Sequence, residues 1–537
     1  MKQKRKIIIL SVVLAVLIVA LTLVSVFNLG GKPKQTTGTT LSSEQRAPVL
    51  QVKKEEVRSI EVFYGDNHLV YLASSYQPTL PPVATNPAAT ASPTPRPTPQ
   101  PDVAWTLQGY EDARVNESLL KSTAEGLLVV SNVQEITDNS DNLAQFGLES
   151  SKNRIIYTLK NGNKHEVLIG KEVPGASQFY ARDASNSRVC TVTSVVDRMQ
   201  NSILDYLDKK IIPFPVEDWA TIELKRKADQ FDFVARAHPY DPTPADPNDR
   251  KSDEHYKTEG QIALYWDALR PMERKVDVDN LQTLVSQLIN LSAVNFVEYN
   301  PSDLARYGLN DPAYSIVLTD GSRSLEIKIG DASGDGNFYA IASNNDAVFR
   351  VSSDATANLD VSPERLFDRW AALQGIFHVK KLTATYDGNT YVAEIFVPTP
   401  KEEEKDDTLE ENFILNGADA NVTSSRDKSY FKEWYTAIIG ILADGLDLEN
   451  EPDLSAAPDF HFHYEHRNGD PDKDVKLYKR DEHSYFMVVD DEYIGMYYNA
   501  SNLTDQRAST LGLYPATERL LTAMEKAVDG VYDFPEN

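Results

Sequence analysis

The amino-acid sequence predicts an α+β protein, in which an N-terminal transmembrane helix is followed by tandem repeated modules of antiparallel strands packed with a helix. Two observations carry this prediction. The apolar segment Ile7–Phe27 holds no charged residue. A pattern of about 50 residues that begins at Asn142 recurs from Asp303, about 160 residues later. Recurrence over that length indicates a repeated structural unit.

The repeated pattern consists of turn and core residues. A Tyr/Phe-Gly-Leu motif opens it, an apolar run ending in Ile-Gly follows, and a Phe-Tyr-Ala motif leads into a last apolar run. The two sets are Phe146–Leu148, Ile169-Gly170, Phe179–Ala181 and Val189–Val192, and Tyr307–Leu309, Ile329-Gly330, Phe338–Ala340 and Val348–Val351. Because these shared residues build the unit, we expect function to depend on what the copies do not share.

Length and charge limit the possible functions. A chain of 537 residues is too long for one ordinary core and predicts three or four units. The net charge is −26, and such a surface repels nucleic acid, so we expect no nucleic-acid partner. The one cysteine, Cys190, excludes an internal disulfide, and its apolar surroundings predict a buried structural thiol.

The N-terminus predicts a signal anchor. Residues 1–6 form a basic cytoplasmic tail, and a helix over Ile7–Phe27 would span about 31 Å, which matches a bilayer core. Val24–Leu29 offers no small-residue cleavage site, although a cleaved secretory signal is the alternative. The positive-inside rule then predicts a single-pass protein of the cell membrane with the bulk of the chain outside. Residues 28–50 form a tether.

Three modules and a C-terminal segment are expected after the tether. Their boundaries are 51–215 with a proline-rich insert at 77–101, 216–376 with an insert at 238–257, 377–514 with an insert at 397–411, and 515–537 for a C-terminal helix and tail. The three polar inserts interrupt the same hairpin position in each copy. Loops on one side of a stacked array tolerate such insertions without harm to the core.

The first module begins with a hairpin. Strands Ile60–Phe63 and Leu69–Ala73 flank Gly65–Asn67, which is a hairpin signal. Ordered sequence resumes at Trp105–Leu107, and the apolar periodicity predicts a helix over Asn116–Leu128.

The second module repeats this order. Ile222–Leu224 and Phe231–Arg236 form the hairpin, and ordered sequence resumes at Ile262–Trp266. A helix is predicted over Val278–Leu291, because its apolar residues recur at helical spacing.

The third module is a degenerate copy without the Tyr-Gly-Leu motif. Its hairpin is Leu382–Tyr386 and Tyr391–Phe396, ordered sequence resumes at Phe413–Leu415, and a helix is predicted over Tyr430–Leu442. Later strands are expected at Asp459–Tyr464, Val475–Tyr478, Tyr485–Val489 and Tyr493–Tyr498, and a last helix at Ala516–Ala527.

Two segments resemble metal sites. Strand alternation places His461, His463 and Glu465 on one face, and two imidazoles with a carboxylate suit zinc or iron. A solvated outer face opposite buried aromatic residues is the preferred interpretation. Asp331–Asn337 begins like a calcium loop, but Ala342 stands where the bidentate Glu belongs, which favours a simple turn. We therefore expect no metal, no cofactor and no catalytic residue.

The order of these elements resembles the bacterial "domain of unknown function 4340" family of membrane-anchored proteins. The matching residues are Trp105–Leu107, Phe146–Leu148, Ile169-Gly170, Tyr180–Arg182, Tyr307–Leu309, Ile329-Gly330 and Tyr339, and the resemblance covers about Val52 to Asp387. It implies an extracytoplasmic partner of an ABC transporter, encoded beside a gliding-type auxiliary component. It supplies no active-site residues.

The leading expectation is a membrane-anchored, non-enzymatic accessory or binding protein that works with an ABC transporter permease or auxiliary subunit. The alternatives are a cell-envelope scaffold or surface-interaction protein without a transporter, and an envelope hydrolase. The proline-rich insert motivates the scaffold, since such spacers hold domains away from a bilayer. The many acids and the His461–His466 segment motivate the hydrolase.

Overall fold

The structure is a computed structural model that describes residues 47–76, 102–137, 141–237, 260–399, 402, 408–467, 469–507 and 511–534. The predicted helix Ile7–Phe27 and the first two inserts lie outside these residues, as do residues 400–401 and 403–407 of the third insert. None of the helices in the described ranges combines the length and apolar character needed to cross a bilayer.

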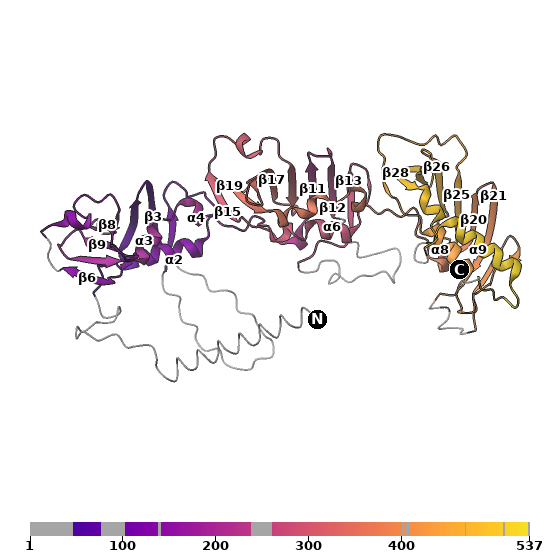
Figure 1. Cartoon of the computed structure of the whole chain (residues 1–537), viewed down its shortest axis with the longest axis horizontal. Coiled ribbons are helices and arrows are strands. Elements are labelled where there is room, and N and C mark those ends of the chain that lie inside the picture. The colour runs from indigo at the N-terminus through magenta and orange to yellow at the C-terminus, as the bar shows by residue number, and fades with distance from the viewer. Residues whose placement is uncertain are drawn as a thin grey trace, which may run out of the picture. The chain divides into compact units, whose positions relative to one another are not determined.

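The described chain forms three large antiparallel sheets with few helices (Figure 1). Two compact units contain them. One unit comprises residues 1–108 and 121–200 and contains the first sheet, and the other comprises residues 109–120 and 201–537 and contains the second and third sheets.

The first sheet has eight strands in the order β4-β3-β2-β7-β8-β9-β10-β6. The strands are β2 (Val57–Tyr64), β3 (Asn67–Tyr76), β4 (Asp102–Leu107), β6 (Gln134–Thr137), β7 (Arg154–Leu159), β8 (Lys164–Glu172), β9 (Phe179–Asp183) and β10 (Val189–Val192). Strand β1 (Leu50–Gln51) pairs separately with β5 (Val129–Val130). The helices are α2 (Glu117–Leu127), α3 (Ser194–Met199) and α4 (Ile203–Tyr206).

The second sheet has nine strands in the order β14-β13-β12-β11-β16-β17-β18-β19-β15. The strands are β11 (Thr221–Arg226), β12 (Asp232–Ala237), β13 (Trp266–Arg270), β14 (Arg274–Lys275), β15 (Asn295–Tyr299), β16 (Tyr314–Thr319), β17 (Ser324–Ala332), β18 (Asn337–Ala342) and β19 (Asn345–Ser352). Helix α6 (Val278–Val285) ends before the predicted Leu291, where a 3₁₀ turn over Leu288–Asn290 replaces its last turn.

The third sheet has nine strands in the order β23-β22-β21-β20-β25-β26-β27-β28-β24. The strands are β20 (Val379–Tyr386), β21 (Asn389–Phe396), β22 (Asn412–Leu415), β23 (Ala418–Asp419), β24 (Gly445–Leu446), β25 (Phe460–His466), β26 (Lys473–Lys479), β27 (Ser484–Val489) and β28 (Glu492–Asn499). Helices α8 (Tyr430–Ile439) and α9 (Leu513–Lys526) pack against each other beside it (Figure 1).

The three sheets share one topology. In each, a strand that follows the helix in sequence returns to pair with the last strand of the sheet, as β6 does with β10, β15 with β19, and β24 with β28. The third copy therefore has the repeated strand order even though it lacks the Tyr-Gly-Leu motif. Helix α9 is long and follows the last strand of the third copy, whereas only short 3₁₀ turns follow β19 in the second.

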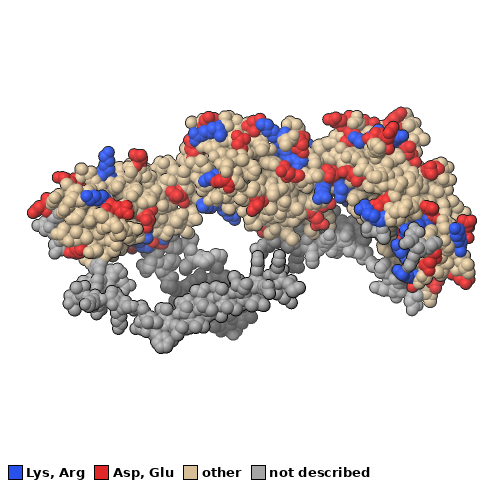
Figure 2. Space-filling view, viewed as in Figure 1, with Lys and Arg blue, Asp and Glu red and all other residues tan. Residues whose placement is uncertain are grey.

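The core of each sheet follows the strand alternation. In the third sheet, Phe460, Phe462 and Tyr464 are buried, while the side chains between them are half-buried. Acidic and basic side chains are interspersed over the face drawn in Figure 2.

Candidate functional site

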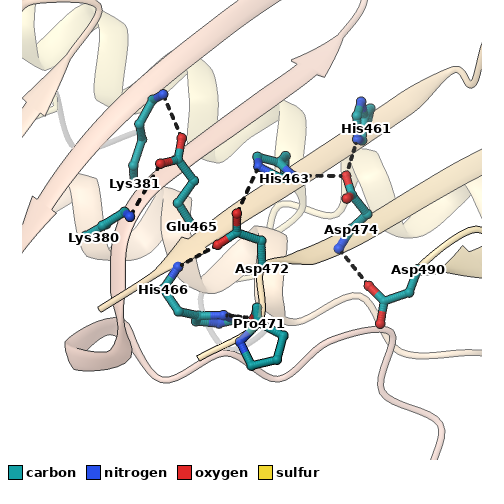
Figure 3. A network of polar contacts seen from close by, with 10 residues as sticks. All are labelled: Lys380, Lys381, His461, His463, Glu465, His466, Pro471, Asp472, Asp474 and Asp490. Carbon is teal, nitrogen blue, oxygen red and sulfur yellow. Dashed lines mark hydrogen bonds and ion pairs between the residues drawn. The ribbon is translucent and has the colours of Figure 1, made fainter. Parts of the chain in front are cut away.

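The histidine-rich strand β25 carries the metal candidates proposed from the sequence. His461, His463 and Glu465 lie on its half-buried face, as the alternation predicts. Figure 3 shows where their side chains point. The strand places them on one face but does not bring all three together.

Both histidines contact Asp474 of the neighbouring strand β26 (Figure 3). The distance from His461 Nε2 to Asp474 Oδ1 is 2.6 Å, and that from His463 Nδ1 to the same oxygen is 3.2 Å. The register explains this contact, because Asp474 is the strand partner of His463. The backbone N–H of Asp474 donates to Asp490 Oδ1 at 3.0 Å, which holds the backbone at this position.

Glu465 turns to the lysines of β20 instead. Its carboxylate lies 2.7 Å from Lys381 Nζ and 3.7 Å from Lys380 Nζ. In the part of the chain that the structure describes, no group of three His, Cys, Asp or Glu side chains has the geometry to hold a metal ion. The arrangement is a charge network on the outer face of a sheet.

The carboxyl groups of this network are held ionised. Burial opposes the ionisation of Asp474, but hydrogen bonds from His461 and His463 outweigh it and lower the pKa of the carboxyl. The hydrogen bond from Lys381 lowers the pKa of Glu465 in the same way. Carboxyls of lowered pKa are acceptors and poor general acids at neutral pH.

His466, at the end of the strand, lies on the opposite face and is only 9% exposed. Its Nδ1 is 2.5 Å from the carbonyl oxygen of Pro471, and its Nε2 is 2.8 Å from Gln374 Oε1. This histidine therefore joins the segment before β20 to the turn after β25. Its role is structural, and strand alternation was the signal that separates it from His461 and His463.

The calcium-like segment is a turn between β17 and β18. Gly334 and Gly336 have left-handed φ angles of 86° and 80°. The hydroxyl of Ser333 donates to the Asp335 carboxylate, which also pairs with Arg350. Asp335 is thus engaged by protein groups, in agreement with the turn predicted from the sequence.

A cavity of about 720 Å³ that the sequence did not indicate lies in the third module, with part of its wall formed by the end of the second. Its lining comes from the segment before β20, from α8 and the chain on either side of it, and from the chain between β28 and α9. This volume lies within the range of pockets that bind small molecules. We regard it as the candidate binding site.

A buried carboxylate on α8 lies at this cavity. The side chain of Glu433 is 10% exposed, and its Oε1 pairs with Lys428 and lies 3.9 Å from Arg519 Nη1. Its Oε2 is buried and has no hydrogen-bond partner among the described residues. Because this atom has essentially no surface accessible to water, it is an unsatisfied acceptor inside the protein and not a contact for a ligand in the cavity.

Other polar groups of the lining are held in place by the protein. Asp444 Oδ2 accepts from the backbone N–H of Asn499 at 2.7 Å and from Asn502 Nδ2 at 2.9 Å. Arg369 donates from Nη1 to the carbonyl oxygen of Ala443 at 3.2 Å. These contacts fix the positions from which the groups meet a ligand.

An aromatic side chain completes the cavity wall. Trp370 forms an isolated strand bridge with Leu442, and its backbone N–H donates to Asp368 Oδ1 at 3.1 Å. The residue nevertheless remains 38% exposed. The backbone of Trp370 is therefore anchored while its ring stays accessible.

The family comparison covers part of the first sheet, all strands of the second and the first two strands of the third. A family model described as "Domain of unknown function (DUF4340)" matches residues 105–261 and 266–395. The match ends in β21, so that the histidine-rich strand and the residues of α8 and α9 lie beyond it. No curated protein and no solved structure matches the chain.

Proposed function

The chain belongs to the DUF4340 family, and from this we propose that it is a membrane-anchored, extracytoplasmic and non-enzymatic accessory or binding protein of an ABC-type transporter. The observation that carries the binding role is the cavity of the third module. It lies in the copy that departs most from the shared pattern, where α9 has been added beside α8.

The N-terminal sequence supports the membrane anchor. The basic cluster Lys2–Lys6 and the uncharged segment Ile7–Phe27 have the order and length of a cytoplasmic tail followed by a spanning helix. In this proposal three folded modules, the third of them divergent, follow the helix and lie on the extracytoplasmic side of the membrane.

The electrostatics support a non-enzymatic role. Hydrolases that use paired carboxyls need one of them to hold a proton near neutral pH, which requires a raised pKa. Where a carboxyl of the described residues has a shifted pKa, the shift is downward, as for Asp447, Asp474 and Glu465. These groups act as fixed anions in ion pairs.

The transporter association is tested by purification of the full-length tagged chain from its own membranes in mild detergent. We expect a permease or ATPase subunit to be recovered. A control chain in which Ile7–Phe27 is replaced by an unrelated transmembrane helix of equal length shows whether the modules or the anchor hold the transporter. Recovery of neither subunit would overturn the association.

A scaffold without a transporter is the second candidate, and the proline-rich residues 77–101 favour it. The same purification separates the two, because a scaffold would yield envelope proteins in place of a permease. An envelope hydrolase is the third candidate. It predicts bound metal in the purified protein that is lost when His461 and His463 are replaced by alanine.

A further inference from the structure

We propose that residues 367–379, which connect the second sheet to the third, are a docking surface for a protein partner with an apolar and acidic contact face. This segment is called the second linker. The inference rests on the accessory role proposed above and names the surface that holds the transporter subunit. It depends on a comparison with the first linker, residues 207–219, which leads into the second sheet.

The two linkers are built alike, at a constant offset of 160 residues. Each forms two isolated strand bridges, three residues apart, and then a 3₁₀ turn. The bridges join Leu207 to Val115 and Lys210 to Ser292 in the first linker, and Phe367 to Val276 and Trp370 to Leu442 in the second. The turns are Val216–Asp218 and Ile376–His378. Differences between the exposed side chains of the two linkers are therefore not required by the backbone.

The outward positions of the second linker carry large apolar side chains. Trp370 is 38% exposed, Leu373 58% and Phe377 39%, and no other eight-residue stretch of the described chain holds three exposed large apolar residues. Their counterparts in the first linker are Lys210, Pro213 and Glu217. The large apolar residues of the first linker, which include Phe214, Val216 and Trp219, are buried instead. The apolar surface of the second linker thus goes beyond what the fold needs, as at an interaction site.

The three side chains fit within the footprint of one partner. Trp370 and Phe377 are seven residues apart, so that even a fully extended chain would separate them by at most about 25 Å. An ordinary protein interface buries about 800 Å² on each side and is at least this wide. Large aromatic side chains are also the residues that most often dominate the binding energy of such interfaces.

The second linker is basic, although the chain as a whole is acidic. Residues 365–381 hold four basic side chains and one acidic, whereas their counterparts, residues 205–221, hold two basic and four acidic. Lys380 and Lys381 share the single carboxylate of Glu465, so positive charge remains in excess there. Charge complementarity therefore points to carboxylates on the partner, around the apolar contact.

A protein fits this surface better than a lipid bilayer or a second copy of the chain. Trp370 lies in the wall of the cavity, and a flat bilayer does not follow a concave surface. The net charge of −26 also repels anionic headgroups and another copy of the same chain.

The test places the photo-crosslinking residue benzoylphenylalanine at Leu373 of the full-length chain and irradiates its own membranes. We expect a crosslinked product that mass spectrometry identifies as a permease or auxiliary subunit of the transporter. The same residue at Pro213, the counterpart in the first linker, is the matched control and should give at least about tenfold less product. No product, equal yields at the two positions, or a product with lipid, with a second copy or with any other protein would overturn the inference.

Two variants give the second linker the residues of the first. Trp370→Lys and Phe377→Glu introduce the side chains that stand at positions 210 and 217, so we expect the backbone to fold unchanged. Each should lower recovery of the transporter subunit at least about tenfold, because one aromatic contact is lost. Hydrogen exchange of peptides from α8 checks that the third sheet and its helices remain folded. Pro213→Ser in the first linker is the control and should leave recovery unchanged.

Failure of this inference is distinguishable from failure of the proposed function. If the wild type recovers the transporter subunit and both variants recover it equally well, the accessory role remains and this surface is refuted. If the wild type itself recovers no transporter subunit, the proposed function fails first.

Discussion

A Cβ atom on Gly330 would lie 2.2 Å from the carbonyl oxygen of Tyr307, and a Cβ on Gly170 would lie at the same distance from the carbonyl oxygen of Phe146. The Ile-Gly and Tyr/Phe-Gly-Leu motifs are therefore two sides of one contact. The glycine inside the second motif ends a 3₁₀ turn in the left-handed region, with φ of 70° at Gly147 and Gly308 alike. Close backbone approach explains why both copies keep these residues.

Gly330→Ala should destabilise the second module by at least about 2 kcal/mol, because no side chain fits against the Tyr307 backbone. Hydrogen exchange of peptides from β17 and β18 measures the loss within that module. Gly321→Ala is the matched control, since Gly321 has a positive φ but open space around its missing Cβ. It should cost only about 1 kcal/mol of backbone strain. Equal losses in the two variants would contradict the contact.

Tyr386→Phe should destabilise the third module by about 1–3 kcal/mol. The Tyr386 hydroxyl accepts from Trp434 Nε1 at 3.0 Å and lies 2.7 Å from Thr517 Oγ1, which in turn donates to the Leu513 carbonyl at 2.6 Å. Removing the hydroxyl leaves the buried indole N–H without its acceptor. The measurement is hydrogen exchange in α8 and α9.

The control for this variant is Tyr391→Phe, at a half-buried tyrosine whose ring contacts both Tyr386 and Trp434. It should change the stability of the module by less than about 0.5 kcal/mol. If Tyr386→Phe is equally mild, the buried chain of hydrogen bonds does not stabilise the packing of α8 on α9.

Asp474→Asn should lower the melting temperature at neutral pH and have little effect in strong acid. The lowered pKa of Asp474 means that its ionised form stabilises the folded protein. This stability is complete above the ordinary aspartate pKa of about 3.9 and is lost as the pH falls through the lowered value. The groups that face the carboxylate are His461 and His463 on β25, with Lys476 nearby on its own strand.

Melting curves of the wild type and the variant from pH 7 to pH 2 measure this difference. Asp470→Asn serves as the control, because Asp470 is exposed in the turn between β25 and β26. Its melting curve should follow that of the wild type throughout. A constant difference for Asp474→Asn down to pH 2 would show that the carboxylate charge is not what stabilises the strand pair.

The sequence predicted the sheets better than their edges. Hairpin turns, apolar alternation and the repeated motifs were enough to place the third copy, whose strand order matches the others. Strands β6, β15 and β24 were missed, because short strands such as β6, with mostly exposed residues, have no alternation to detect. Pairing with β10 stabilises β6, and this partner lies more than 50 residues away.

The structure also differs from the prediction in the segment that follows the second insert. Ile262 is buried as its apolar character predicts, but its backbone N–H donates to Gln282 Oε1 of α6, and the strand begins only at Trp266. Burial and strand pairing are separate properties, and an apolar run alone does not distinguish them.

The candidate site was the least predictable part. Alternation correctly placed His461, His463 and Glu465 on one face, but the partners that separate them, Asp474 and Lys381, come from the registers of two other strands. The cavity is lined by residues from Arg369 to Gly512, which only the tertiary structure brings together. Single residues such as Trp370 and Glu433 carry no motif.

That the folded modules act outside the membrane is tested most directly by cysteine labelling. The only cysteine, Cys190, is buried, so Ala457→Cys introduces the one thiol at an exposed position. In intact spheroplasts a membrane-impermeant maleimide should label the variant fully and leave the wild type unlabelled. Labelling of the variant only after the membrane is permeabilised would place the modules in the cytoplasm and contradict the proposed function.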